Sequence, residues 1–239
     1  MKALRFLFIL LGLSMGSCQS QKDRPQKEYE LISEDGENRI EKFDSTDLDL
    51  AIELKKMAEI DQIAAYIPQG KYKELTSEQW IAFKDSVFST HQVRLKEIFD
   101  KYGFVGFDLA GEEGSSNFWL MVQHSDHDPE FQKVVLEKMK IEVDKGNADS
   151  RNYALLFDRV QLNTGQAQIY GTQVDYNMEI CQAFPKNLAD SVNVNKRRKE
   201  MGLQPLEEYL NDMTLMNFEM NKEFYAKKGI MAPKLYKTN

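Results

Sequence analysis

Residues 128–146 read DPEFQKVVLEKMKIEVDKG, and this stretch contains a complete helix with a signal at each end. Asp128 provides an acceptor side chain for the N-cap, and Pro129 suits the first helical position, where no N–H is needed. Gly146 follows the last turn, as glycine does where a helix ends in a left-handed residue. The stretch predicts a helix from Pro129 to about Lys145.

Apolar residues recur at helical spacing on the N-terminal side of this stretch. They predict three more helices, at residues 49–67, 76–102 and 118–122. A capping box of Thr46 and Asp49 begins the first helix, and Pro68 ends it. Residues 103–114 contain four glycines and are expected to form a loop.

Apolar residues also recur at helical spacing on the C-terminal side of residues 128–146. Helices are predicted from about residue 150 to 161, from 192 to 201 and from 205 to 228. Residues 162–165 (LNTG) are typical of a turn between two short strands. The sequence therefore predicts a mainly α fold, a single helical domain with one short β-hairpin near 160–173.

The N-terminus has the three parts of a secretory signal peptide. Lys2 and Arg5 are its positive residues, residues 6–13 (FLFILLGL) are its apolar run, and small residues follow. The apolar run is too short to cross about 30 Å of hydrocarbon as a helix. We interpret residues 1–17 as the signal peptide, 18–44 as a polar tether and 45–239 as the helical domain.

Residues 15–18 (MGSC) resemble the bacterial lipobox, in which the cysteine becomes the lipidated first residue of the mature protein. The alternative is a plain cleaved signal with an incidental cysteine. Residues 21–23 (QKD) resemble a signal that directs some lipoproteins to the outer face of the outer membrane. The resemblance implies a protein of the cell envelope, lipid-anchored to the outer membrane through Cys18, and either periplasmic or surface-exposed.

The net charge and the cysteine content limit which kinds of partner the protein is expected to bind. The net charge is −7, and removal of residues 1–17 takes away two cations and no acid, which makes it −9. An acidic protein gains no long-range attraction to nucleic acid or anionic lipid, so the acyl chains must provide the membrane attachment. Cys181 has no intramolecular partner if Cys18 is lipidated, and its apolar neighbours favour a small buried hydrophobe over a reactive thiol.

The densest polar cluster is residues 123–128 (QHSDHD), which hold two of the three histidines. His124 is a candidate general base oriented by a carboxylate. Alternatively, His124 and Asp126 bind a divalent metal with an outside ligand, although their spacing matches no established zinc motif. The plainer interpretation makes Asp128 a helix cap and His124 a hydrogen-bonded core histidine.

Further polar residues lie beside apolar elements. Lys196–Lys199 form a basic patch, which is either a solvated helix face or an anion site. The candidate catalytic residues are His124, Asp126 and Asp158. The candidate ligand-binding residues are Asp61, Gln62, Gln123, Arg159, Tyr170, Gln173, Arg197 and Arg198. The chain has no Gly-rich phosphate loop, nucleophile elbow or metalloprotease helix motif, so P-loop, Rossmann and serine-hydrolase functions have no support.

Several of these motifs occur together in a bacterial domain family of unknown function, which residues 50–209 resemble. The similar segments are Gln123-His124-Ser125-Asp126-His127-Asp128, Asp158-Arg159-Val160, Tyr170-Gly171-Thr172-Gln173 and Arg197-Arg198. The family has no established reaction. The resemblance implies that the polar residues belong together, and it names no substrate or cofactor.

Two hypotheses from different classes follow. In the first, the chain is a lipid-anchored enzyme or binding protein with a polar His/Asp/Arg/Gln pocket for a small molecule, hydrolytic or ligand-binding. In the second, it is a non-catalytic structural or interaction lipoprotein whose polar residues form an internal hydrogen-bond network. The sequence leaves open whether the protein is an enzyme, and it favours the first hypothesis slightly.

Overall fold

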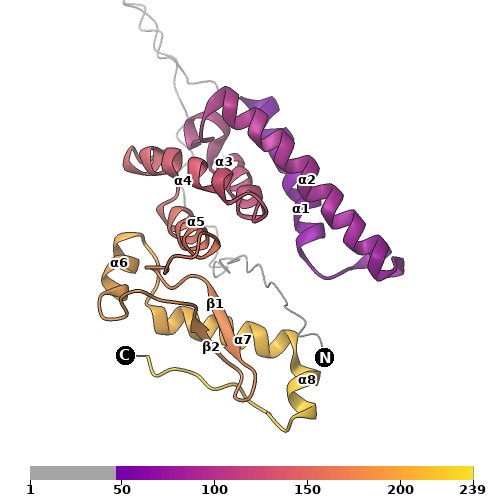
Figure 1. Cartoon of the computed structure of the whole chain (residues 1–239), viewed down its shortest axis with the longest axis vertical. Helices are drawn as coiled ribbons and strands as arrows, with labels where there is room; N and C mark the ends of the chain where they lie inside the picture. Colours follow the sequence, from indigo (N-terminus) through magenta and orange to yellow (C-terminus); the bar gives the residue numbers. More distant parts are fainter. Residues whose placement is uncertain (1–46, 239) are drawn as a thin grey trace, which may run out of the picture. The chain divides into compact units, whose positions relative to one another are not determined.

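The computed structural model describes residues 47–238, which belong to one compact unit, residues 44–239 (Figure 1). The predicted signal peptide, the lipidation site Cys18 and nearly all of the predicted tether lie outside the described residues. Within the described part of the chain, no helix is both long enough and apolar enough to cross a membrane.

The described residues form helices and one two-stranded antiparallel sheet, which confirms the predicted mainly α fold. The elements in chain order are α1 (Leu48–Ala65), the 3-10 helix η1 (Gly70–Glu74), α2 (Ser77–Tyr102), α3 (Phe107–Gln123), α4 (Pro129–Asp144), α5 (Ser150–Asn163), β1 (Val174–Asn177), β2 (Gln182–Pro185), α6 (Val194–Glu200), α7 (Leu206–Met220) and α8 (Lys222–Lys227).

Local capping signals set several helix starts. Asp128 caps α4 by accepting a hydrogen bond from the N–H of Phe131, as its position before Pro129 predicts. Thr76 and Gln79 form a full capping box at the start of α2. Thr46 lies outside the described residues, and α1 is capped by Asp47, whose carboxylate accepts from the N–H of Leu50 at 3.0 Å.

The loop predicted at residues 103–114 is wrong, because α3 begins at Phe107. Gly111 has a φ of +69° and a non-helical ψ, so α3 consists of two helical segments that meet at a kink at this residue. A Cβ on Gly114 would lie 2.6 Å from the Cβ of Ala110 and 3.7 Å from Ala51 of α1. This glycine therefore makes room for Ala110 within α3, a role that the sequence alone does not distinguish from a turn.

The hairpin lies further along the chain than predicted. Residues 160–163 form the last turn of α5, which Thr164 closes by donating from its hydroxyl to the carbonyl of Val160. Strands β1 and β2 pair from Val174 opposite Pro185 to Asn177 opposite Gln182. The hairpin packs against α7, where the Thr214 hydroxyl accepts a hydrogen bond from the N–H of Ala183 at 2.9 Å. The support of α7, rather than the LNTG turn signal, decides where strands form.

The single helix predicted at 205–228 is interrupted at Asn221, which separates α7 from α8. The Asn221 side chain donates to the carbonyl of Asn217, which also accepts from the N–H of Asn221, so a local side-chain bond is added at the end of α7. The break brings Tyr225 against Phe218, with ring centroids 5.7 Å apart. Cys181 is buried in the same cluster, as expected for a small hydrophobe.

Helix α3 packs against several other helices. It packs extensively against α1 and also contacts α2, α4 and α5 (Figure 1). Its second half, from Phe118 to Gln123, is entirely buried. Because α3 ends at Gln123, the polar residues that follow begin inside the molecule rather than on its surface.

Candidate functional site

Asp61 lies on the buried face of α1. The buried residues of this helix recur at intervals of three and four, and Asp61 occupies the position between Ala58 and Ala64. Its side chain is only 1% exposed. A carboxylate in such a position needs partners, because burial of an unpaired charge costs several kcal/mol.

Two histidines from different elements face this carboxylate. His124, the first residue after α3, is hydrogen-bonded through its Nδ1 to Oδ2 of Asp61. His91 of α2 places its Nδ1 3.8 Å from Oδ1 of Asp61, which is an ion-pair distance and not a hydrogen bond. Three segments distant in sequence therefore meet at one carboxylate, which we call the Asp61 centre (Asp61, His91 and His124).

The electrostatics of the Asp61 centre favour the ionised carboxylate. Burial raises the pKa of Asp61, but the hydrogen bond from His124 and the neighbouring His91 ring outweigh this effect, so the pKa lies below its ordinary value. The Asp61–His124 bond also determines the His124 tautomer. When Nδ1 carries the shared proton, Nε2 carries a lone pair.

Three polar atoms of the Asp61 centre are buried without a hydrogen-bond partner among the described residues. They are Oδ1 of Asp61, Nδ1 of His91 and Nε2 of His124. The His124 ring packs edge-on against Phe88, with centroids 5.7 Å apart. Buried polar atoms are rarely left unpaired, and their concentration at one centre is typical of a site that takes a water, an ion or a reacting group.

His91 was absent from the residues selected by sequence. A signal was nevertheless present, because His91 lies four residues after Val87 and four before Leu95, both buried on α2. A histidine on the apolar face of a helix needs a buried partner. The sequence could not identify that partner, because Asp61 lies 30 residues away on another helix.

Asp126 belongs to a different set of contacts from His124. Its Oδ2 accepts from Nη1 of Arg159 at 2.7 Å, and its Oδ1 accepts from Gln132 at 3.1 Å and from Asn163 at 2.9 Å. This arrangement ties the 124–128 loop to α4 and α5. The Nε of Arg159 is buried without a partner among the described residues.

Asp158 is fully buried and anchors the loop that follows α5. Its Oδ1 accepts from the N–H groups of Ile169 and Tyr170, at 2.9 and 3.1 Å. Its Oδ2 accepts from the N–H and hydroxyl of Thr172, at 2.9 and 3.0 Å. Burial raises the pKa of Asp158, and these four donors oppose the shift.

The two arginines of the basic patch also support this loop. Arg197 donates from Nε to the carbonyl of Ile169 at 2.8 Å and pairs with Asp190. Arg198 is fully buried and donates to the carbonyl of Tyr170 at 2.7 Å. Its guanidinium also lies 4.8 Å from the ring centroid of Tyr209. Arg197 therefore holds the residue just before the Tyr170-Gly171-Thr172-Gln173 segment, and Arg198 holds the first residue of that segment.

Each of the remaining candidate residues from the sequence lies at the Asp61 centre, beside Asp126 or in the Asp158 loop. Gln62 lies 3.5 Å from Oδ2 of Asp61 and borders the Asp61 centre. The carbonyl of Gln123 accepts from Gln132, which places it beside Asp126. Tyr170 and Gln173 belong to the Asp158 loop, where Gln173 donates to the Thr172 hydroxyl at 3.3 Å.

His127 and Asp128 face outward. His127 is exposed and bonds to Gln92 of α2. Asp128 caps α4 and also pairs with Lys96 at 2.6 Å, which lowers the pKa of its carboxyl. Of the two histidines in the 123–128 cluster, only His124 enters the Asp61 centre.

The Asp61 centre lies apart from the groove between α4 and α5, and it is not a metal site among the described residues. Among residues 47–238, no group of three His, Cys, Asp or Glu side chains is placed to hold a metal ion, and His124 and Asp126 point to different partners. A groove of about 640 Å³ lies between α4 and α5 and is lined by residues such as Tyr153, Phe157 and Gln161. It contains none of the candidate catalytic residues.

Comparison with known proteins identifies one family. No curated protein and no solved structure shows significant similarity to the chain. A family model described as "Family of unknown function (DUF6624)" matches residues 48–217, which run from the start of α1 into α7. The match includes the Asp61 centre, Asp126 with Arg159, and the Asp158 loop. The chain therefore belongs to this family of unknown function, DUF6624.

Proposed function

We propose that the protein is a lipid-anchored extracytoplasmic protein whose Asp61 centre performs acid–base chemistry on a small molecule, with hydrolysis as the reaction class. The observation that supports the proposal is the set of three buried atoms at this one centre that have no hydrogen-bond partner among residues 47–238. A purely structural histidine would use both of its ring nitrogens or expose one to water. His124 does neither.

The chemistry follows from the His124 tautomer. Asp61 accepts a hydrogen bond from the Nδ1–H of His124 and orients the ring, which leaves Nε2 free to remove a proton from water attacking a substrate. The ionised Asp61 then stabilises the imidazolium that forms. His91, on the other oxygen of Asp61, is the more exposed of the two rings and marks the side from which a small substrate would approach.

Hydrolysis of p-nitrophenyl acetate by the soluble fragment 24–239 tests the proposal, because this ester is small and requires only a base. We expect His124→Gln to lower the rate by about tenfold or more, within the range of general-base contributions. His127→Gln is the matched control, because His127 is exposed and lies outside the Asp61 centre, and it should leave the rate unchanged. Equal rates in the parent and both variants, all folded by circular dichroism, would contradict an acid–base centre.

A second candidate function is supported by the other polar contacts. The carboxylates of Asp126 and Asp158 both accept hydrogen bonds inside the protein, from side chains and from backbone N–H groups. They are what a structural or interaction lipoprotein with an internal hydrogen-bond network would contain. If His124→Gln lowers the melting temperature while the parent shows no hydrolysis and no ligand-induced thermal shift, this second function replaces the first.

The proposed location in the envelope depends on Cys18, which lies outside the described residues. The lipobox-like residues 15–18 support acylation of Cys18, and residues 21–23 support an outer-membrane destination. We expect Cys18→Ala to move the protein from the detergent-requiring membrane fraction to the soluble fraction of cells. Gln26→Ala, which lies outside residues 15–18 and 21–23 and retains Cys18, is the control for changes in the region. Persistence of the Cys18→Ala variant in the membrane fraction would rule out the acyl anchor.

A further inference from the structure

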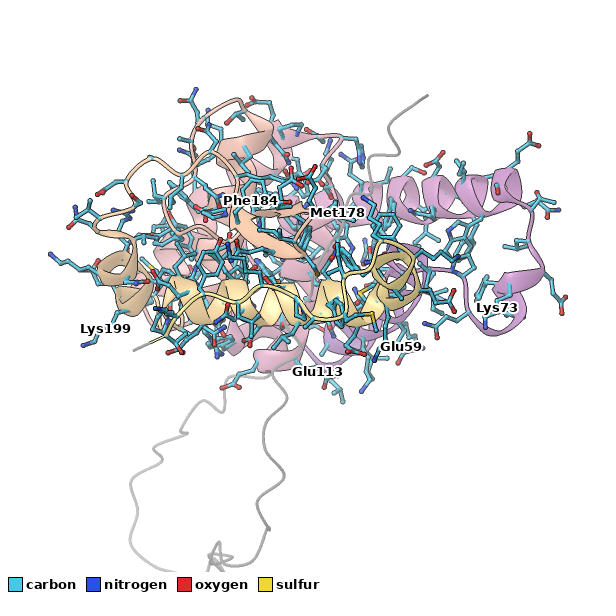
Figure 2. All side chains as sticks on the ribbon, turned by 90° about the horizontal axis from the view of Figure 1, so that it is seen from below. Glu59, Lys73, Glu113, Met178, Phe184 and Lys199 are labelled. Atoms are coloured by element: carbon cyan, nitrogen blue, oxygen red, sulfur yellow. The ribbon has the colours of Figure 1, made fainter. Side chains whose placement is uncertain are left out.

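The connection between α1 and α2 extends beyond the buried core. We call residues 66–84 the hairpin tip; they include η1 and the first two turns of α2. No residue of the tip is buried, whereas Ala64 just before it and Val87 just after it are core residues. In Figure 2, the labelled Lys73 lies on this connection, toward one edge of the molecule.

Aromatic side chains cluster in the tip. Tyr72 lies 5.9 Å from Trp80 and 5.0 Å from Phe83 between ring centroids, and Trp80 lies 5.4 Å from Phe83. All three are half-buried, and they pack on one another. The tip therefore has a small apolar centre of its own, which leaves its other apolar residues free of the main core.

Two large aliphatic side chains remain exposed beside this cluster. Ile67 is 62% exposed and Ile81 is 57% exposed, and Tyr66 is also exposed. Single exposed aliphatic residues are ordinary, but several within one short connection, next to half-buried tryptophan and tyrosine, mark a contact surface.

The charges in the tip identify the chemistry of the partner. Residues 66–84 contain three lysines (Lys71, Lys73 and Lys84) and two acids, in a chain whose net charge is −7. The Lys71 ammonium lies 5.2 Å from the Tyr72 ring centroid. Tryptophan, tyrosine and lysine around exposed isoleucines are the combination found at membrane interfaces, where rings occupy the headgroup layer and lysine stems reach outward to phosphates.

We propose that the hairpin tip inserts into the headgroup layer of a lipid bilayer, with Ile67 and Ile81 as the apolar contacts. A weak contact is sufficient if Cys18 is acylated as proposed above. The roughly 30 residues from Cys18 to Asp47 span at most about 100 Å even when fully extended, so the anchor holds the domain near the bilayer. Two weak attachments then act together.

The experiment separates the tip from the anchor by using fragment 24–239, which lacks Cys18 but contains the whole compact unit 44–239. Binding to phosphatidylcholine vesicles, with and without phosphatidylglycerol, is measured by co-sedimentation and tryptophan emission. Trp119 is buried in α3, so a response to lipid reports Trp80. We expect a blue shift and quenching by lipids brominated on their acyl chains, and Trp80→Phe should abolish the quenching.

Two double variants, one in the hairpin tip and one outside it, test whether the tip itself binds the vesicles. Ile67→Asp with Ile81→Asp should weaken vesicle binding by about tenfold or more. Val192→Asp with Met231→Asp, which changes equally exposed apolar residues outside the tip, should not weaken it. The proposal is overturned if the fragment binds neither vesicle or if both pairs weaken binding equally. It is also overturned if the tip pair only converts a dimer to a monomer, which would make the tip a self-association surface.

Discussion

Replacing Asp158 with alanine is expected to lower the free energy of unfolding by about 3–5 kcal/mol, the usual cost of removing one partner from a buried charged network. The change leaves the N–H groups of Ile169, Tyr170 and Thr172, together with the Thr172 hydroxyl, without their acceptor. Each unpaired buried donor is costly because water cannot replace the lost bond. Urea unfolding of fragment 24–239, followed by circular dichroism, measures the loss.

Two controls distinguish this network from a general effect of removing a carboxylate. Asp144→Ala removes an exposed partner of Lys140 and should cost less than about 1 kcal/mol. Asp158→Asn retains one acceptor oxygen and should fall between the parent and Asp158→Ala. If Asp158→Ala were as stable as Asp144→Ala, the loop would not depend on this carboxylate.

Asp61→Ala is expected to cost about 3 kcal/mol at neutral pH. It removes a charged acceptor from the Nδ1 of His124 and leaves that nitrogen buried without a partner. It also removes the carboxylate that lies 3.8 Å from His91. Glu59→Ala is the control on the same helix, because Glu59 is exposed, and it should change stability by less than about 0.5 kcal/mol.

The cost of Asp61→Ala should depend on pH in a defined direction. The folded state lowers the pKa of Asp61 below its ordinary 3.8, so the unfolded chain takes up the proton first as pH falls. The stabilisation by Asp61 is therefore complete above the ordinary value and disappears as pH falls through the lowered one. The stability difference between the parent and Asp61→Ala should narrow in acid. A difference that stays constant or widens between neutral pH and about pH 3 would show that Asp61 is not the ionised centre described here.

The agreement between sequence and structure is best where a signal is local. The start of α4 follows from Asp128 and Pro129, and the start of α2 follows from Thr76 and Gln79. Each cap depends on atoms within four residues of one another, so no distant part of the chain can change it.

The sequence-based predictions are wrong where the same residue type is compatible with two different local structures. Gly114 looks like a loop residue but makes room for Ala110 inside α3. Residues 162–165 look like a hairpin turn but end α5, while the true hairpin forms where α7 supports it. For the hairpin, the deciding contact comes from a helix far away in sequence, and local propensity cannot encode it.

The same distinction between local signals and contacts distant in sequence applies to the candidate site. The sequence selected Asp61 and His124 as polar residues beside apolar ones, but it grouped them with Asp158, Arg197 and Arg198. The structure places Asp61 and His124 together and assigns the other three to the support of one loop. Which polar residues share a partner depends on helix packing, because their separations in sequence range from a few residues to more than a hundred.

By itself, the sequence determined the helical class, the capped helix starts and the polar residues that must find partners when buried. Tertiary structure alone decided that α1, α2 and the end of α3 converge, which brings His91 and His124 to the two oxygens of Asp61. The physical reason is that amphipathic faces specify what must be buried but not against which helix. The pairing is selected by close packing, such as that of α3 against α1, and the chemistry of the centre follows from that packing.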